Sequence, residues 1–246
     1  METTTALPDD DIGLIGRMIR VFYAPGETFA AVRQRQTWAD WVIPLLVVMV
    51  VAMAAAYVIM PVVKEFTTQQ MSEQFANNPD IKPEDLERIE KMQGTFQTIG
   101  ILVATPAAVV FFTLLKSALL LILAKFFLGG EIRFNQTLAI SAYAGLIEIV
   151  RSIVTTPLIL SNKTLQIQTG LGLLLPEETL KTFLGRYLAA IELFTFWQVG
   201  IAAVGLTFIA GLPFRKAFVG VLVMWLLWLV VQAGLGGLGA MFNPGG

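Results

Sequence analysis

The chain has 246 residues, of which 56% are hydrophobic and only 14% are charged, and its formal net charge is −1. It contains no cysteine and no histidine, which excludes disulfides, thiolate zinc sites and catalytic dyads of the Ser-His or Cys-His kind. The balanced charge gives no basic field for nucleic acid, and no other pattern indicates a catalytic, metal or cofactor site.

The first 40 residues precede any long apolar run and have the pattern of an amphipathic segment. Three aspartates start a predicted helix over residues 9–24, and Pro25-Gly26 ends it. Two interpretations remain open: the helix packs under the membrane spans, or it lies in the plane of anionic headgroups. Trp38 and Trp41 stand where an interfacial aromatic anchor belongs. Apolar residues recur at helical spacing at Ile12, Ile15, Ile19 and Phe22.

Five long apolar runs determine the fold class. Each reaches about 20 residues, which is the helical length that crosses a bilayer core of about 30 Å. Backbone groups in lipid must be satisfied within their own segment, so we expect helices. The sequence therefore predicts an all-α integral membrane protein with five transmembrane helices and an amphipathic N-terminal interfacial segment. Residues 1–40 form that cytosolic segment and residues 41–242 the membrane domain, with spans at 41–63, 99–124, 138–160, 187–210 and 217–242.

The longer loops carry weaker signals. The acidic residues Asp80, Glu84, Asp85, Glu87 and Glu90 lie in the polar loop at 64–96, but their spacing does not match a calcium-binding loop. A solvated helix face explains them better than a cation site. The loop at 161–186 is half apolar, and it predicts a re-entrant or interfacial piece followed by a helix near Pro176.

The two shortest loops, at 125–137 and 211–216, indicate the orientation. Their cations are Lys125, Arg133, Arg215 and Lys216. Short cytoplasmic loops are enriched in Lys and Arg, so these turns favour a cytosolic N-terminus. An odd number of spans then places the C-terminus outside.

Four charged residues fall inside the predicted spans, namely Lys116, Glu148, Arg151 and Glu192. A charge at the centre of a membrane helix costs on the order of 3 kcal/mol, so such residues usually face protein or water. Glu148 lies near the middle of its span, and Arg151 follows three residues later on the same face. We expect a polar network across the second, third and fourth spans.

That network has two interpretations. The pairs join the spans, or they form a proton or ion path in a small transporter or channel. If they join the spans, Glu148→Gln destabilises the fold because it leaves Arg151 without a partner.

Four stretches carry a resemblance to a known family. They are YAPGETFAAVRQRQTWADWVIPLLV (23–47), LGGEIRFNQTLAISAYAGLIEIV (128–150), IELFTFWQVGIAAVGL (191–206) and GLPFRKAF (211–218). In order and spacing they resemble the Yip-domain family of Ypt/Rab-interacting multispan membrane proteins, in its bacterial branch. The family-motif positions are Gly129 and Gly130 of the Gly-Gly turn, Tyr143 of the Ala-Tyr-Ala third span, and Trp197 of the fourth span. Family members often carry a proline after the Ala-Tyr-Ala, where this chain has Gly145-Leu146-Ile147.

The resemblance implies five spans, a cytosolic N-terminus and a non-enzymatic role in membrane organisation or partner-protein binding. In a bacterial member the location is the cytoplasmic (inner) membrane. The expected partners are the lipid bilayer and membrane or peripheral proteins, and rows of small residues also permit a homo-oligomer. Eukaryotic relatives bind Rab-type GTPases, but the matching positions here are mostly structural and do not carry that partner over.

Overall fold

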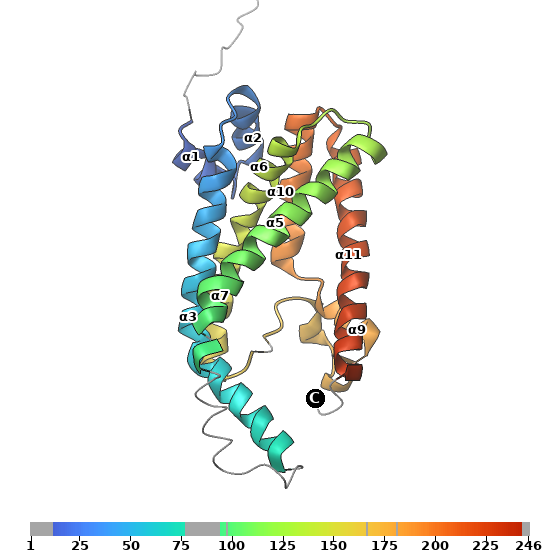
Figure 1. Ribbon diagram of the computed structural model, residues 1–246. Coiled ribbons are helices and arrows are strands. Elements are labelled where there is room, and N and C mark those ends of the chain that lie inside the picture. The colour runs from blue at the N-terminus through green and yellow to red at the C-terminus, as the bar shows by residue number, and fades with distance from the viewer. Residues whose placement is uncertain (1–11, 77–93, 97, 166, 181, 243–246) are drawn as a thin grey trace, which may run out of the picture.

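The computed structural model describes residues 12–76, 94–96, 98–165, 167–180 and 182–242. Within these residues five segments are long and apolar enough to cross a membrane, as the sequence predicts. Strand pairing in the described residues is limited to one isolated bridge, between Gly170 and Glu192. The fold is therefore an all-α bundle of five spans (Figure 1). The spans are Ala39–Gln69, Gly94–Phe127, Phe134–Asn162, Leu193–Ala210 and Phe214–Gly234.

The helical elements follow one another with few long connections in the described residues. Two of them, η1 and η2, are π-helical and lie at the two ends of the second span, and η3 is a 3-10 helix. In chain order they are α1 (Leu14–Arg20), α2 (Pro25–Gln34), α3 (Ala39–Ala76), η1 (Gly100–Ala104), α5 (Thr105–Ile122), η2 (Leu123–Phe127), α6 (Phe134–Gly145), α7 (Ile147–Asn162), η3 (Leu171–Leu174), α8 (Glu177–Leu180), α9 (Phe183–Ala189), α10 (Leu193–Ala210) and α11 (Phe214–Phe242).

The observed ends of the helices differ most from the predicted ones at the end of the first span and at the start of the fourth. Helix α3 has 38 residues and continues to Ala76, well beyond residue 63. At about 1.5 Å per residue it is about 57 Å long, so its last turns project beyond a hydrocarbon core of about 30 Å. Helix α10 begins at Leu193 and not near residue 187, because Tyr187 belongs to α9. The acidic residues between Asp80 and Glu90 lie outside the described residues.

The third span consists of two helices, α6 and α7, separated at Leu146. The backbone N–H of Leu146 donates to the carbonyl of Tyr143 at 3.1 Å, and that of Ile149 donates to Leu146 at 3.0 Å. These bonds reach back three residues, as in a tighter 3-10 turn. The third span is therefore interrupted at Leu146 without a proline at that place.

Large apolar side chains are exposed on the outer surface of the spans. The exposed fraction is 64% for Val50, 60% for Phe111, 66% for Ile153 and 64% for Leu227. A soluble monomer rarely exposes so many large apolar side chains over a continuous surface. Lipid is the solvent that accepts this surface, and the helices satisfy their own backbone groups within it.

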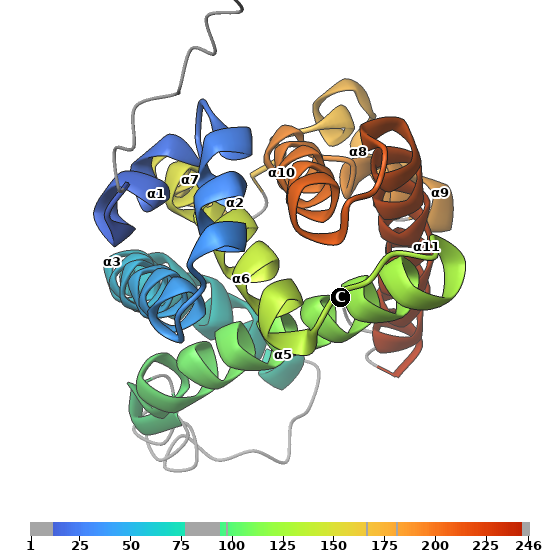
Figure 2. The same cartoon turned by 90° about the horizontal axis from the view of Figure 1, so that it is seen from above.

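The N-terminal helices α1 and α2 pack on one end of the bundle, which we call the N-terminal face. Helix α2 packs against α10, and α1 packs against α2 and α3, at the rim of the bundle (Figures 1 and 2). The fully buried ring of Phe29 makes an edge contact with Tyr143, with ring centroids 6.0 Å apart. A Cβ at Gly205 of α10 would lie 2.8 Å from Ile140 and 3.2 Å from Phe29. The missing side chain therefore lets α2, α6 and α10 approach closely.

At the opposite face a connecting segment, residues 163–192, joins the third span to the fourth; we call it the excursion. Helix α7 ends at Asn162, and the next residue, Lys163, has a left-handed φ of 51°. The short elements η3, α8 and α9 follow, and α9 packs against α11. The side chain of Thr182 caps α9 by accepting the backbone N–H of Gly185 at 3.0 Å. This excursion returns the chain to the fourth span beside α11.

Candidate functional site

A chain of polar contacts links three spans in the middle of the membrane domain. The Lys116 amine on α5 donates to the Gln198 Oε1 atom on α10 at 3.2 Å. The Gln198 amide in turn donates to the Glu148 Oε1 atom on α7 at 2.6 Å. Glu148 is the middle residue of the 29-residue third span, so these contacts lie near the centre of that span. Gln198 thus connects Lys116 to Glu148.

The same chain continues from Glu148 towards the opposite face. Arg151 Nη1 lies 3.5 Å from Glu148 Oε2, and Arg151 Nη2 lies 2.6 Å from Glu192 Oε2. Glu192 is the residue that precedes α10, so it lies at the end of the fourth span and not within it. The four charged residues singled out from the sequence therefore lie in one series of contacts, with Gln198 as an additional member.

Local structure places these side chains. The interruption at Leu146 makes Glu148 a first-turn residue of α7, where the helix dipole favours a negative charge. The side chains of Glu148 and Arg151 are 35% and 34% exposed, whereas that of Glu192 is only 16% exposed. The two cations and two carboxylates sum to zero, which lowers the cost of holding them among the spans.

Sequence reasoning did not select Gln198, which is 7% exposed. The signal was present: Gln198 is the only amide side chain in the apolar run from Leu193 to Ala210. An uncharged polar residue in a membrane helix commonly hydrogen-bonds across helices. A search limited to charged residues overlooks it.

The position of Glu192 depends on a close backbone contact with Gly170. These two residues form the isolated antiparallel bridge, and the N–H of Leu171 donates to the carbonyl of Ile191 at 3.2 Å. A Cβ at Gly170 would overlap that same carbonyl oxygen. Only glycine allows the excursion to pass this close to the start of α10.

We expect Gly170→Ala to move the backbone at Ile191 and weaken the ion pair between Glu192 and Arg151. The loss should be about 1–3 kcal/mol, because a backbone atom cannot rotate away from the clash. Thermal melting of the purified protein in detergent checks this. Gly200→Ala is the matched control, since its Cβ would meet no neighbour within 4 Å. Equal melting temperatures for the two variants would contradict the expectation.

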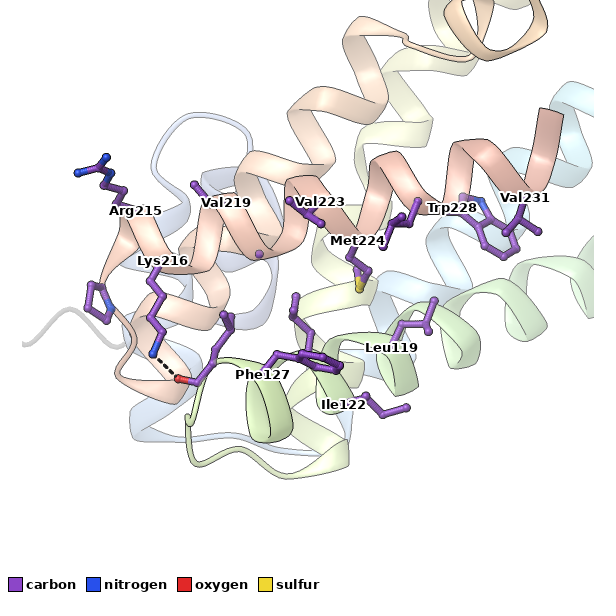
Figure 3. Close-up of a pocket in the computed structure, with 15 residues that line it drawn as sticks. Leu119, Ile122, Phe127, Arg215, Lys216, Val219, Val223, Met224, Trp228 and Val231 are labelled. Atoms are coloured by element: carbon purple, nitrogen blue, oxygen red, sulfur yellow. Dashed lines mark hydrogen bonds between the residues drawn. The ribbon is translucent and has the colours of Figure 1, made fainter. Parts of the chain in front are cut away.

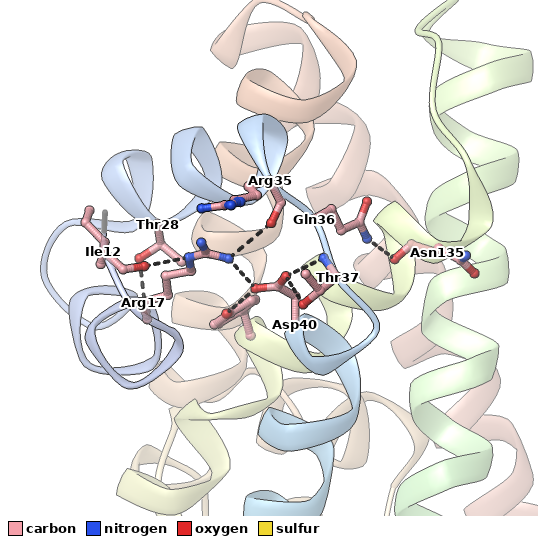
Figure 4. A network of polar contacts seen from close by, with 9 residues as sticks. Ile12, Arg17, Thr28, Arg35, Gln36, Thr37, Asp40 and Asn135 are labelled. Atoms are coloured by element: carbon pink, nitrogen blue, oxygen red, sulfur yellow. Dashed lines mark hydrogen bonds and ion pairs between the residues drawn. The ribbon is translucent and has the colours of Figure 1, made fainter. Parts of the chain in front are cut away.

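A second buried polar cluster ties the N-terminal segment to the spans (Figure 4). The Arg17 guanidinium donates to Asp40 Oδ1 at 2.8 Å, and the side chains of Arg17 and Asp40 are 8% and 0% exposed. The hydroxyl of Tyr143 donates to the same oxygen at 3.1 Å. The backbone N–H and hydroxyl of Thr37 donate to Asp40 Oδ2 at 2.8 and 3.1 Å. Each carboxylate oxygen of Asp40 therefore accepts two hydrogen bonds.

Arg17 also holds the N-terminal segment together internally. Its Nε donates to the carbonyl of Ile12 at 2.9 Å, and its own carbonyl accepts the hydroxyl of Thr28 at 3.1 Å. Through its side chain and its backbone carbonyl, Arg17 thus connects α1, α2 and the start of α3. Because the pair is buried and hydrogen-bonded on both sides, we call Arg17, Thr37, Asp40 and Tyr143 the anchor cluster.

Tyr143 and Trp197, two of the four positions that carry the family resemblance, pack against the N-terminal segment. Tyr143 is part of the anchor cluster, and the ring of Trp197 makes an edge contact with Phe22 at a centroid distance of 6.3 Å. Two of these positions therefore contact the N-terminal segment directly.

The other two motif positions, Gly129 and Gly130, shape the turn between α5 and α6. Gly129 has φ of 66°, a left-handed conformation that favours glycine. A Cβ at Gly130 would lie 3.2 Å from Leu212 in the turn between α10 and α11. The Lys216 amine donates to the Leu128 carbonyl at 2.7 Å, which joins the same two turns.

In the described residues, no group of three or more Asp and Glu side chains lies close enough to hold a metal ion. Both clusters contain an Arg-carboxylate pair together with neutral hydrogen-bonding partners. Chemically, such an arrangement holds helices together, and the chain from Lys116 to Glu192 could also relay charge.

Comparison with known families places these contacts in a wider context. The family model described as the Yip1 domain matches residues 19–235, which covers most of the chain. The match begins at the end of α1 and includes all of α2. No curated protein and no solved structure matches the chain.

Proposed function

Because this chain belongs to the Yip1-domain family of multispan membrane proteins, we propose that it is a non-enzymatic protein that organises the membrane through its N-terminal face. The observation that carries this proposal is an apolar stripe on the rim helix α1. Ile15, Ile19 and Tyr23 are 73%, 56% and 71% exposed. The three residues are spaced four apart. Ile15 and Ile19 therefore share one side of α1, and Tyr23 lies just beyond the end of the helix.

The anchor cluster fixes the direction in which this stripe points. Arg17 and Val21 lie on the inner side of α1 and are 7% and 0% exposed. Since Arg17 is bound to Asp40, α1 cannot turn its apolar side inward without breaking a buried ion pair. The stripe therefore stays on the outer surface of the bundle.

An interfacial tryptophan near the stripe supports a position of the stripe at the headgroup layer. Trp38, 69% exposed, directly precedes α3 and stands where aromatic side chains anchor a span at the interface. Helix α1 packs against the same end of α3. An apolar ridge embedded in one leaflet widens that leaflet relative to the other, which favours curvature. This is the mechanism by which the protein would organise the membrane.

The orientation belongs to the same proposal. The turns that join α5 to α6 and α10 to α11 lie at the N-terminal face, and they carry Lys125, Arg133, Arg215 and Lys216. Positive short loops are typical of the cytoplasmic side, so the N-terminal face is cytosolic and the C-terminus lies outside. In a bacterial cell this membrane is the inner membrane.

The experiment compares liposomes that contain the full chain with protein-free liposomes of the same phosphatidylcholine and phosphatidylglycerol mixture. Wild type should shift vesicles to smaller diameters or tubules in electron micrographs. The variant Ile15→Ser with Ile19→Ser should leave them like protein-free vesicles. The matched control is Leu173→Ser with Leu174→Ser at the opposite face, where the two leucines are 71% and 81% exposed.

Two outcomes would overturn the proposal. If the stripe variant deformed vesicles as strongly as wild type, the stripe would not act on the membrane. If instead it released a stoichiometric protein that wild type retains on purification from native membranes, the stripe would be a partner-binding surface. Deletion of residues 1–35 is a poor test, because it removes the buried side chains of Phe29 and Val32.

A second candidate function, a small transporter or channel, is favoured by the polar chain from Lys116 to Glu192. We propose instead that this series of polar contacts holds the spans α5, α7 and α10 together. Glu148 and Glu192 both contact Arg151, and Lys116 contacts Gln198. Proton or sodium flux into liposomes tests the alternative. Flux that wild type supports and Glu148→Gln abolishes would establish transport, whereas equal leakage would support the joining role.

A further inference from the structure

An apolar groove runs along the outer surface of the bundle between α11 and the end of the second span (Figure 3). Its volume is about 990 Å³, at the upper end of the range for sites that hold small molecules. One wall consists of side chains of α11, among them Val219, Val223 and Trp228. The facing wall consists of α5 and η2, among them Leu119 and Phe127.

The groove is closed at the N-terminal face and open along its side. At that end, the backbone of α11 at Gly220 packs closely against Leu128. A Cβ at Gly220 would lie 3.1 Å from the Leu128 side chain. The bond from the Lys216 amine to the Leu128 carbonyl holds the same corner together. Exposed apolar side chains continue from this corner towards the middle of the membrane, with Val223 49% and Leu227 64% exposed.

The charges of the groove are confined to this closed end. Arg215 and Lys216 are the charged side chains of the lining, and the lining contains no acidic residue. In Figure 3 the Arg215 guanidinium extends away from the apolar walls, while the Lys216 amine turns inward to Leu128. Arg215 is exposed and presents the planar donor group that binds phosphate oxygens in pairs.

The length of the groove fits a lipid that lies along the spans. From Arg215 to Val231 it covers 16 helical steps, or about 24 Å. One leaflet of hydrocarbon is about 15 Å deep, so this length accommodates a headgroup region and the acyl chains of one leaflet. A cationic end at the interface followed by an apolar channel is the arrangement that suits an anionic glycerophospholipid.

We propose that this groove is a binding site for one anionic glycerophospholipid, with its phosphate at Arg215 and an acyl chain between α5 and α11. The cationic end distinguishes this occupant from a second copy of the chain, which would cover the apolar walls without needing an anion. The proposal does not depend on the α1 stripe, because the groove shares no residue with it.

The test measures lipids retained by the full chain in native mass spectrometry after incubation with palmitoyl-oleoyl phosphatidylglycerol or phosphatidylcholine. Wild type should retain one phosphatidylglycerol and much less phosphatidylcholine. Arg215→Gln should lower phosphatidylglycerol retention by about tenfold and leave phosphatidylcholine unchanged. Val223→Trp, which fills the apolar channel, should lower retention of both lipids.

The matched control is Arg33→Gln, an exposed cation of α2 outside the groove. If Arg33→Gln and Arg215→Gln had the same effect, binding would reflect general attraction to a positive surface, and the proposed site would be wrong. Equal retention of the two lipids by wild type would also overturn it. The proposal would also be overturned if wild type formed a dimer without bound lipid and Val223→Trp converted that dimer to monomers. Unchanged melting temperatures verify that each variant is folded.

Discussion

Replacing Asp40 with alanine is expected to cost about 3–5 kcal/mol of folding free energy, because Arg17 then remains buried without a counter-charge. The hydroxyl of Tyr143 and the donors of Thr37 lose their acceptor at the same time. The measurement is the free energy of unfolding in mixed micelles titrated with dodecyl sulfate. Trypsin should also cleave after Arg20 faster in Asp40→Ala than in wild type, since α1 is no longer held.

A double-mutant cycle separates the ion pair from simple loss of packing. Replacing both members, Arg17→Met with Asp40→Ala, removes the two charges together and should be less destabilising than Asp40→Ala alone. If the double variant instead lost as much stability as the two single variants added together, Arg17 and Asp40 would not be coupled.

The second large effect is expected for Arg151→Met, which should cost about 2–4 kcal/mol. The substitution leaves Glu148 and Glu192 without the cation that contacts both of them. Lys116 is the other cation in this series of polar contacts, and it is linked to Glu148 through Gln198. Unfolding in the same mixed micelles measures the loss, and Arg151→Lys is the control that keeps the charge.

The two carboxylates should contribute unequally. Arg151 lies 2.6 Å from Glu192 and 3.5 Å from Glu148, so Glu192→Gln should destabilise more than Glu148→Gln. This changes the expectation drawn from the sequence, in which Glu148→Gln alone leaves Arg151 unpaired. A larger loss for Glu148→Gln would show that the i,i+3 contact within α7 matters more than the contact between helices.

The sequence was sufficient to predict the membrane spans, because length and hydropathy alone determine whether a helix can cross a bilayer. It was less informative about where the spans end. Helix α3 continues as a polar helix beyond residue 63, and α9 takes up Tyr187 before the fourth span begins. Helix ends depend on capping and tertiary contacts, such as the bridge between Gly170 and Glu192, that hydropathy does not describe.

The anchor cluster could not be predicted, because its members come from distant parts of the chain. Arg17 and Asp40 are 23 residues apart, and Tyr143 lies 103 residues from Asp40. Arg17 has the sequence context of a solvated residue on an amphipathic helix, yet it faces inward while Ile15 and Ile19 face outward. One local signal exists: the spacing from Thr37 to Asp40 matches the start of a helix with a reciprocal cap.

The intramembrane residues show the opposite situation. A charge inside an apolar run is visible in the sequence, and its cost in lipid requires a partner somewhere nearby. The identity of that partner is set by helix packing, which brings α10 next to α7. Gln198 is therefore clear in the structure and easy to overlook in the sequence.

Helices α1 and α2 are expected to be a fixed part of the membrane domain, held by the anchor cluster. The chain has no cysteine, so two cysteines can be introduced and spin-labelled without interference. We would place them at the exposed positions Gln34 at the end of α2 and Arg215 at the start of α11. Electron paramagnetic resonance in lipid nanodiscs should give one narrow distance distribution, which Asp40→Ala broadens. A broad distribution in the otherwise unmodified chain would contradict that expectation.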